Sequence, residues 1–274
     1  MIRLRICWRA GALICMTLGL CLVLAPMRAL RRGAGKDAAT DRVVGLWARG
    51  ARALIRMRLH VEGAVPEGPV AIVANHLSYI DIVALWCVVP GVFVARADVA
   101  DWPLIGPVGR FIGTIFIERT RKRDLLRVIP LMEAPLAAGR SVIFFPEGTS
   151  SRGETVLPFR SSLFEAAARQ GVPVAGASLK FRTHPPAVPA DWSVCWWGDM
   201  DFTPHILELL ALPAFEAHLR FAAPGVAVAP AARPPSAVRK ALCREAHGAV
   251  LAAFEPTVTT PTDAPAAAPE PRTA

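Results

Sequence analysis

The 274-residue sequence lacks several patterns that identify common classes of protein. Its six cysteines include no C-x-x-C pair, so neither a zinc site nor a disulfide framework is predicted, and a reducing compartment is favoured. It contains no G-x-S-x-G, which argues against a serine hydrolase. Gly148 and Gly153 have the spacing of a phosphate-binding loop, but Glu154 stands where that loop needs a lysine. A nucleotide hydrolase therefore loses support as well.

Acidic residues are scarce at the N-terminus, so the net positive charge of the chain is concentrated there. The first 60 residues hold twelve Lys or Arg against two Asp or Glu, whereas the remainder holds nineteen against twenty. The net charge of +9 is therefore a property of the N-terminus. We expect anionic lipid headgroups, and not nucleic acid, to be the partner of this basic segment.

A long uncharged run lies between Arg9 and Arg28. Its eighteen residues would extend about 27 Å as a helix, against a hydrocarbon layer of about 30 Å. We predict a membrane anchor. A cleaved signal peptide is the competing interpretation, but no small-x-small cleavage site is clear. Basic residues on both sides leave the orientation open and would suit a helix that dips into one leaflet.

The following segment has the pattern of an amphipathic helix over residues 43–57. At 100° per residue, one apolar face is formed by Val43, Leu46, Trp47, Ala51, Leu54 and Met57. Arginines, including Arg49, Arg52 and Arg56, gather on the opposite face. We expect this helix to lie on a membrane surface. The alternative is a helix whose apolar face packs on the rest of the protein.

The remaining sequence predicts one α/β domain. Strands are expected at Val70–Ala74, Thr114–Ile117, Ser141–Phe145, Pro173–Ser178 and Val194–Trp197, and helices at Asp81–Val88, Leu125–Ala138, Leu163–Gln170 and Val238–Phe254. This alternation indicates a mixed sheet covered by helices over residues 59–254, after a membrane-associating helical pair at 1–58. Residues 255–274, rich in Pro, Ala and Thr, are expected to be disordered.

The segment ANHLSYIDI, residues 74–82, places His76 five positions before Asp81, directly after a predicted buried strand. In one continuous helix this spacing would set the two side chains about 140° apart, so the pair needs a turn. With such a turn Asp81 can accept a hydrogen bond from the imidazole and leave its other nitrogen free to take a proton. A base without a protein nucleophile suits attack by a substrate hydroxyl on an activated acyl group, such as a thioester.

Two further polar clusters follow predicted strands. GTIFIER ends in Glu118 and Arg119, and SVIFFPEGTS turns at residues 146–149. An arginine at a strand end can hold a phosphate, and turn amides can add donors. Taken singly, these features are usually a solvated charge and an ordinary turn, but their occurrence with His76 favours a common site. The remaining histidines considered are interpreted as structural: His184, His205, His218 and His247.

Four motifs resemble the ordered blocks of the glycerolipid acyltransferases, in particular the PlsC-type 1-acyl-sn-glycerol-3-phosphate acyltransferases. They are NHLSYID (75–81), GTIFIER (113–119), FPEGTS (145–150) and VPVAGAS (172–178). The resemblance implies a PlsC-like domain with an N-terminal membrane-associating helical segment. It also implies 1-acylglycerol-3-phosphate O-acyltransferase activity in phospholipid biosynthesis, on the cytoplasmic face of the inner membrane. An acyl group would pass from acyl-CoA or acyl carrier protein to the sn-2 hydroxyl of lysophosphatidic acid, a lysophospholipid acceptor, giving phosphatidic acid.

The resemblance also implies roles for particular residues. His76 corresponds to the catalytic base and Asp81 to its partner, while five residues fall in acceptor-binding blocks: Glu118, Arg119, Glu147, Gly148 and Thr149. No metal and no resident cofactor are implied. In the fourth block Gly176 stands where the family often has proline, which leaves the details of the acyl donor or acyl tunnel open.

Two alternatives remain. Residues 194–206, VCWWGDMDFTPHI, resemble a stretch in proteobacterial family members that include acyltransferases acting on lyso-ornithine lipid. That acceptor has no phosphate, so transfer to another lysolipid is the first alternative. The remote alternative is a catalytically silent, lipid-binding membrane protein with the same fold.

Overall fold

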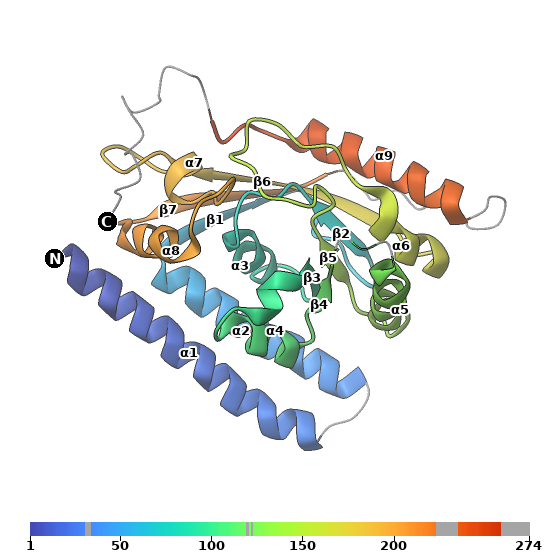
Figure 1. Ribbon diagram of the computed structural model, residues 1–274, viewed down its shortest axis with the longest axis horizontal. Helices are drawn as coiled ribbons and strands as arrows, with labels where there is room; N and C mark the ends of the chain where they lie inside the picture. Colours follow the sequence, from blue (N-terminus) through green and yellow to red (C-terminus); the bar gives the residue numbers. More distant parts are fainter. Residues whose placement is uncertain (31–33, 119–120, 122, 223–234, 259–274) are drawn as a thin grey trace.

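A seven-stranded sheet forms the centre of the computed structural model, which describes residues 1–30, 34–118, 121, 123–222 and 235–258 (Figure 1). The strands are β1 (Met57–Glu62), β2 (Ala71–Ala74), β3 (Val92–Arg96), β4 (Ile115–Ile117), β5 (Val142–Phe144), β6 (Val174–Arg182) and β7 (Phe215–Phe221). Their order across the sheet is β1-β7-β6-β2-β5-β3-β4. β6 and β7 are antiparallel and the other neighbouring pairs are parallel, so the sheet is mixed, as predicted.

Helices cover both faces of the sheet, because the central strand β2 is apolar on both sides and fully buried. Ile72 faces the layer of α3 (Ile80–Trp86) and α8 (Phe202–Ala211). Val73 faces the layer of α5 (Asp124–Ala137), α6 (Phe164–Gln170) and α9 (Pro235–Ala253). The shorter helices are η1 (Ala97–Asp101), α4 (Ile105–Ile112), η2 (Ser161–Leu163) and α7 (Ala190–Ser193). This arrangement confirms the predicted α/β class.

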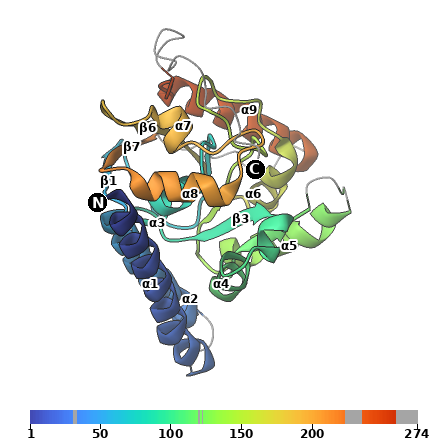
Figure 2. The same cartoon turned by 60° about the vertical axis from the view of Figure 1, so that its left-hand side comes forward.

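Two long N-terminal helices lie against one side of the domain. In both views α1 (Ile2–Leu30) and α2 (Ala34–Leu54) run side by side, with α1 outermost (Figures 1 and 2). Residues 2–27 of α1 are long and apolar enough to cross a membrane, and 11% of an apolar 18-residue window within them is buried. The buried guanidinium of Arg9 donates hydrogen bonds to the carbonyls of Leu210 (2.9 Å) and Leu212 (2.6 Å) at the end of α8. This contact attaches the first half of α1 to the domain.

The buried face of α2 matches the predicted apolar face only in part: Ala51 belongs to both, and Val43 and Trp47 are partly buried. Val44, Ala48, Ala51 and Ile55 are buried, whereas Leu46, which was expected on the apolar face, is 62% exposed. The reason is that α2 lies between α1 and α3, and its buried side packs on protein. The buried side of α2 therefore packs on the rest of the protein and not on a membrane, which was the second of the two predicted alternatives.

Most predicted elements are present, but one predicted strand is wrong. Residues 194–197 form no strand, because their chain leaves α7 and meets the turn between β2 and α3, where the Trp196 N–H donates to the Leu77 carbonyl at 2.8 Å. The strands β1, β3 and β7 and the helices α4, α7 and α8 were not predicted. The sheet begins at Met57, two residues before the expected boundary.

The start of the predicted C-terminal tail is attached to the domain. Glu255 forms ion pairs with Lys180 and Arg220, and the Thr257 N–H donates to the Gly153 carbonyl at 2.8 Å. Residues 255–258 are therefore held by these contacts, which corrects the predicted start of disorder. The remaining part of the predicted tail, 259–274, lies outside the described residues.

Candidate active site

His76 and Asp81 meet at the edge of the sheet where the parallel strands end. β2 ends at Ala74 and α3 begins at Ile80, so the intervening turn brings the two side chains together. His76 Nδ1–H donates to Asp81 Oδ2 at 2.7 Å, which confirms the predicted contact. The same oxygen accepts the N–H groups of Leu77 (2.7 Å) and Ser78 (3.0 Å). The carboxylate is fully buried, so it fixes the tautomer that leaves Nε2 as the basic nitrogen.

The turn that carries His76 is held by groups on two neighbouring strands. The side chain of Asn75 exchanges two hydrogen bonds with the backbone of Leu179 on β6: its amide donates to the carbonyl at 3.0 Å, and its oxygen accepts the N–H at 2.7 Å. Directly after β5, the ring of Phe145 stacks on the imidazole of His76 with centroids 4.0 Å apart and planes 9° apart. These contacts fix where the strand ends and how the imidazole is oriented.

Glu147 is buried beside the same turn and binds its backbone. One oxygen accepts the His76 N–H at 3.1 Å, and the other accepts the Leu157 N–H at 3.0 Å. Burial raises the pKa of Glu147 to about 8, against the two backbone hydrogen bonds, which lower it. The acceptor-binding role of Glu147 stays a prediction. Its geometry supports a positioning role, because both oxygens face the chain of the protein.

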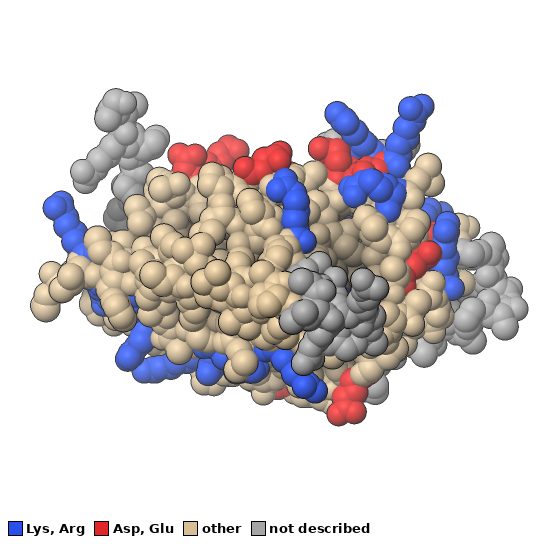
Figure 3. All heavy atoms as spheres, turned by 90° about the horizontal axis from the view of Figure 1, so that it is seen from below, with Lys and Arg blue, Asp and Glu red and all other residues tan. Residues whose placement is uncertain are grey.

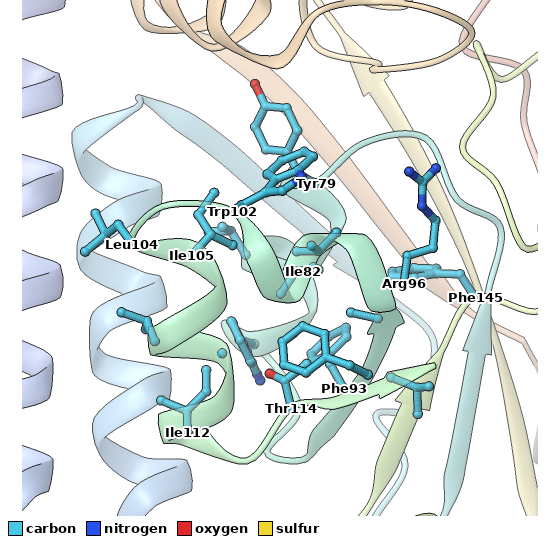
Figure 4. Close-up of a pocket in the computed structure, with 18 of the residues that line it drawn as sticks. Tyr79, Ile82, Phe93, Arg96, Trp102, Leu104, Ile105, Ile112, Thr114 and Phe145 are labelled. Atoms are coloured by element: carbon cyan, nitrogen blue, oxygen red, sulfur yellow. The ribbon is translucent and has the colours of Figure 1, made fainter. Parts of the chain in front are cut away.

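An apolar cavity of about 300 Å³ lies beside His76 (Figure 4). Its lining comes from α3, β3, α4 and β4, with Phe93, Ile112 and Thr114 among the residues drawn in Figure 4. Thr17 and Leu20 of α1 and Trp47 of α2 contribute as well, so the N-terminal helices complete the cavity. A cavity of this size and character fits an alkyl chain or another small apolar group.

Aromatic residues cover the cavity near Tyr79. Trp196, between α7 and α8, and Phe202, the first residue of α8, line it together with Tyr79 and Trp102. His205 Nε2–H donates to the Cys195 carbonyl at 2.9 Å, so its Nδ1 accepts the Tyr79 hydroxyl, also at 2.9 Å. Burial lowers the pKa of His205 and keeps it neutral. His205 thus has the structural role predicted for it, and it links this cover to the turn beside His76.

A basic side chain that the sequence did not single out lines the cavity. Arg96 ends β3, is about half exposed, and pairs with Asp98. Its register partner on β4 is Ile117, the residue before Glu118. Glu118 lies at the end of the adjacent strand, outside the cavity lining, and Arg119 lies outside the described residues. Arg96 is therefore a basic side chain at the cavity, at the end of the strand next to β4.

The turn after β5 contributes to the site through its last residues. Thr149 and Ser150 line the cavity, and Gly148 has a φ of +81°, a conformation that favours glycine. The structure thus brings His76 and Thr149 to one cavity, with buried Asp81 hydrogen-bonded to His76. The fourth motif lies away from the cavity lining, because Gly176 is inside β6. A Cβ at this position would come within 3.0 Å of Val250 of α9.

Comparisons with known proteins point to one family. The acyltransferase family model matches residues 56–180. A 1-acyl-sn-glycerol-3-phosphate acyltransferase of Neisseria gonorrhoeae is 36% identical over 143 residues, covering 52% of this chain and 56% of the relative. The chain thus spans about half the length of this relative. A lyso-ornithine lipid O-acyltransferase of Pseudomonas aeruginosa is 31% identical over 227 residues, covering 82% of this chain and 86% of the relative.

A solved structure shares the fold. The crystal structure of the 1-acyl-sn-glycerophosphate acyltransferase PlsC from Thermotoga maritima matches with a TM-score of 0.58 and 19% identity, over 88% of this chain and 96% of that one. Both kinds of lipid acyltransferase occur among the relatives. Together with the H-x-x-x-x-D pair at the end of β2, these matches show that the chain belongs to the family of PlsC-type acyltransferases.

Proposed function

We propose that the protein transfers a fatty acyl group from an acyl thioester to the free hydroxyl of a lysolipid. The observation that carries this proposal is the hydrogen bond between His76 and buried Asp81 at the wall of an apolar cavity. His76 Nε2 takes the hydroxyl proton as the hydroxyl oxygen attacks the thioester carbon. The carbon–sulfur bond then breaks, and the thiolate leaves with the proton from His76. Asp81 stabilises the imidazolium between the two steps.

The cavity suits the acyl chain in this reaction. Its walls are almost entirely apolar, and His76, Thr149 and Arg96 are among the few polar side chains on them. An alkyl chain buried there would place its thioester at the polar end, next to the imidazole. Holding the chain in this way supplies orientation, which lowers the barrier without any further catalytic group.

Lysophosphatidic acid is the acceptor that we propose first. Support comes from the identity to the Neisseria relative and from the cationic Arg96 at the cavity, which can hold a phosphate through a bidentate contact. The phosphate-holding role of Arg119 and the acceptor-binding roles of Glu118, Gly148 and Thr149 stay predictions. The donor is proposed to be acyl-CoA or acyl carrier protein.

Lyso-ornithine lipid is the second candidate acceptor. The similarity to the relatives with that name extends over 82% of this chain in one case and 74% in another, from Brucella abortus, beyond the residues matched by the family model. Lyso-ornithine lipid carries no phosphate, so an arginine would contribute less to its binding. The two acceptors therefore differ in how strongly they depend on Arg96.

We further propose that the protein acts at the inner membrane with its catalytic domain on the cytoplasmic side. The face that carries α1 has few charged side chains, with Lys and Arg along one edge and Asp and Glu along the opposite edge (Figure 3). Exposed apolar residues on α1 include Leu18, Leu22 and Val23. Because Arg9 attaches α1 to α8, the helix suits a position along one leaflet better than a span detached from the domain.

A panel of lysolipids tests the proposed acceptor. Membranes containing the protein are supplied with a labelled acyl thioester and either lysophosphatidic acid or lyso-ornithine lipid. We expect efficient acylation of lysophosphatidic acid and a ten- to hundred-fold fall in its kcat/KM in Arg96→Ala, from the loss of a charged hydrogen bond of about 1.5–3 kcal/mol. Arg110, an exposed arginine outside the cavity lining, provides the control Arg110→Ala. If the protein acylates lyso-ornithine lipid and not lysophosphatidic acid, lyso-ornithine lipid becomes the proposed acceptor.

A further inference from the structure

Three side chains that can bind a metal converge at the end of the sheet away from the cavity, and a fourth contacts one of them. His60 comes from β1, Glu216 and His218 from β7, and His184 from the turn after β6. The cavity is lined by β3 and β4, at the opposite end of the strand order. None of the four residues takes part in the proposed acyl transfer.

The sheet itself brings these residues together. β1 and β7 are parallel, and His60 is the register partner of His218, so their rings stack with centroids 4.7 Å apart. Glu216 lies two residues before His218 and therefore on the same face of β7. His184 Nε2 is 3.1 Å from one oxygen of Glu216, and His218 Nε2 is 3.4 Å from the other. One carboxylate thus joins two imidazoles, with a third beside them.

We propose that His60, Glu216 and His218, with His184 as fourth ligand, form a site for a divalent transition-metal ion, with zinc as the best match. One ligand atom from each of the first three residues lies within 4.8 Å of the others. In a tetrahedral zinc site, bonds of about 2.0–2.1 Å to nitrogen place ligand atoms about 3.4 Å apart. Closure by about 1.4 Å is within reach of side chains that are exposed or half-buried.

The ligand set decides which metal fits. Three imidazoles and one carboxylate are typical ligands of zinc, whereas magnesium and calcium prefer oxygen ligands throughout. An exposed position on the sheet leaves the ion free to enter from solvent.

Positively charged side chains on the same face of the sheet limit the affinity of the site for a metal ion. Lys180 and Arg182 of β6 are the register partners of His218 and Glu216, and Arg58 of β1 is the other partner of Glu216. Lys180 is paired with Glu255, which offsets its charge. A bound ion would connect β1, the edge strand that follows the N-terminal helices, to β7 and to the turn after β6. We therefore assign the site a stabilising role, separate from the chemistry at His76.

Zinc chloride titrated into the untagged full-length protein in detergent micelles tests the proposal. Calorimetry should show saturable binding of one ion per chain, and the melting temperature should rise with zinc because the ion binds the folded state. Magnesium chloride should give neither effect. In His60→Ala, His184→Ala and His218→Ala, zinc affinity should fall at least about tenfold, since even partners of metal ligands contribute that much.

Two further variants keep the test decisive. His247 lies on α9, outside the cluster, and His247→Gln should bind zinc as the wild type does. Glu216→Gln keeps the shape of the side chain and removes its charge, so it should weaken zinc binding even if a histidine variant fails to fold. The proposal is overturned if binding is not saturable, or if zinc binds His218→Ala and Glu216→Gln as tightly as it binds His247→Gln.

Discussion

A carboxylate oxygen of Glu147 accepts the backbone N–H of His76 at 3.1 Å, across two adjacent strands of the sheet. The other oxygen of Glu147 accepts the N–H of Leu157. The F-P-E-G-T turn therefore contacts the backbone of the proposed base directly. Glu147 therefore positions the backbone of His76, and kinetic measurements can distinguish this role from acceptor binding.

Glu147→Gln should lower kcat with little change in KM for either substrate. An amide has one oxygen, so one of the two backbone N–H groups would lose its acceptor, at a cost of about 1–3 kcal/mol, and the turn carrying His76 would shift. Steady-state kinetics with both substrates measures this. Glu154→Gln, on the same loop but 61% exposed, is the matched control and should leave both constants unchanged. A rise in the acceptor KM alone would instead support contact with the acceptor.

The burial of Glu147 also predicts how stability depends on pH. Its pKa of about 8 in the folded protein exceeds the value of about 4.3 for an unfolded chain. Between these values the folded state binds the extra proton, so stability falls as pH rises, until the folded form also ionises. Glu147→Gln cannot ionise and lacks this effect.

Thermal melts of both proteins in detergent, from about pH 5 to about pH 9, test this dependence. The stability of the wild type relative to Glu147→Gln should decline across the range. A relative stability that is flat or rises with pH would contradict the assigned protonation. Because the variant and the wild type are compared at the same pH, the contributions of other titrating groups to the stability difference largely cancel.

Tyr79→Phe should destabilise the protein by about 1–3 kcal/mol, because it leaves the Nδ1 of buried His205 without its hydroxyl partner. The phenyl ring keeps the packing against Phe202. A double-mutant cycle with His205→Gln tests the coupling, since residues in one hydrogen-bond network are not additive. The double variant should be less destabilised than the sum of the two single variants. Full additivity would show that the bond contributes nothing to stability.

The exposed apolar residues of α1 should control membrane binding. Replacing Leu18, Leu22 and Val23 by glutamine should weaken sedimentation with vesicles at both low and high salt, because burial of apolar surface is insensitive to screening. The control replaces two exposed leucines of α5, Leu126 and Leu131, and should bind as wild type does. Equal binding by both variants would remove α1 from the proposed membrane contact.

The arginines at the end of α2 and in the turn after it should contribute to vesicle binding in a way that depends on salt. Neutralising Arg49, Arg52 and Arg56 should weaken binding to anionic vesicles at low salt and have a smaller effect at high salt. Vesicles of neutral lipid provide the control, because they lack the negative surface that attracts the arginines. Unchanged binding to anionic vesicles at low salt would mean that these side chains only face water.

Parts of the site that are local in sequence could be predicted, and parts assembled by distant contacts could not. His76 and Asp81 lie five residues apart, so their pairing follows from one strand end and one turn. Tyr79 and His205 are separated by 126 positions, and no local pattern connects them. Arg96 was missed because β3 was not predicted, so its place at a strand end was hidden.

The same distinction applies to the fold. β2, β4, β5 and β6 each precede or contain a recognisable motif, and their apolar runs are short and bounded by turns. β7 alternates buried and half-buried residues, and its polar members, including Glu216 and His218, conceal it. The predicted strand at 194–197 failed because its apolar residues, such as Cys195, are buried by tertiary packing, which a local pattern does not distinguish from a strand.

The turnover number of His76→Ala is the measurement that tests the proposed mechanism most directly. Purified wild type and variant are assayed in vesicles with the same acyl thioester and lysophosphatidic acid, with circular dichroism and vesicle binding as checks on folding and location. The loss of a general base predicts a fall in kcat of about 10² to 10⁴, with the fold intact. Asp81→Asn should also be severely impaired, because an amide cannot stabilise the imidazolium. Turnover by His76→Ala close to that of the wild type would contradict the mechanism.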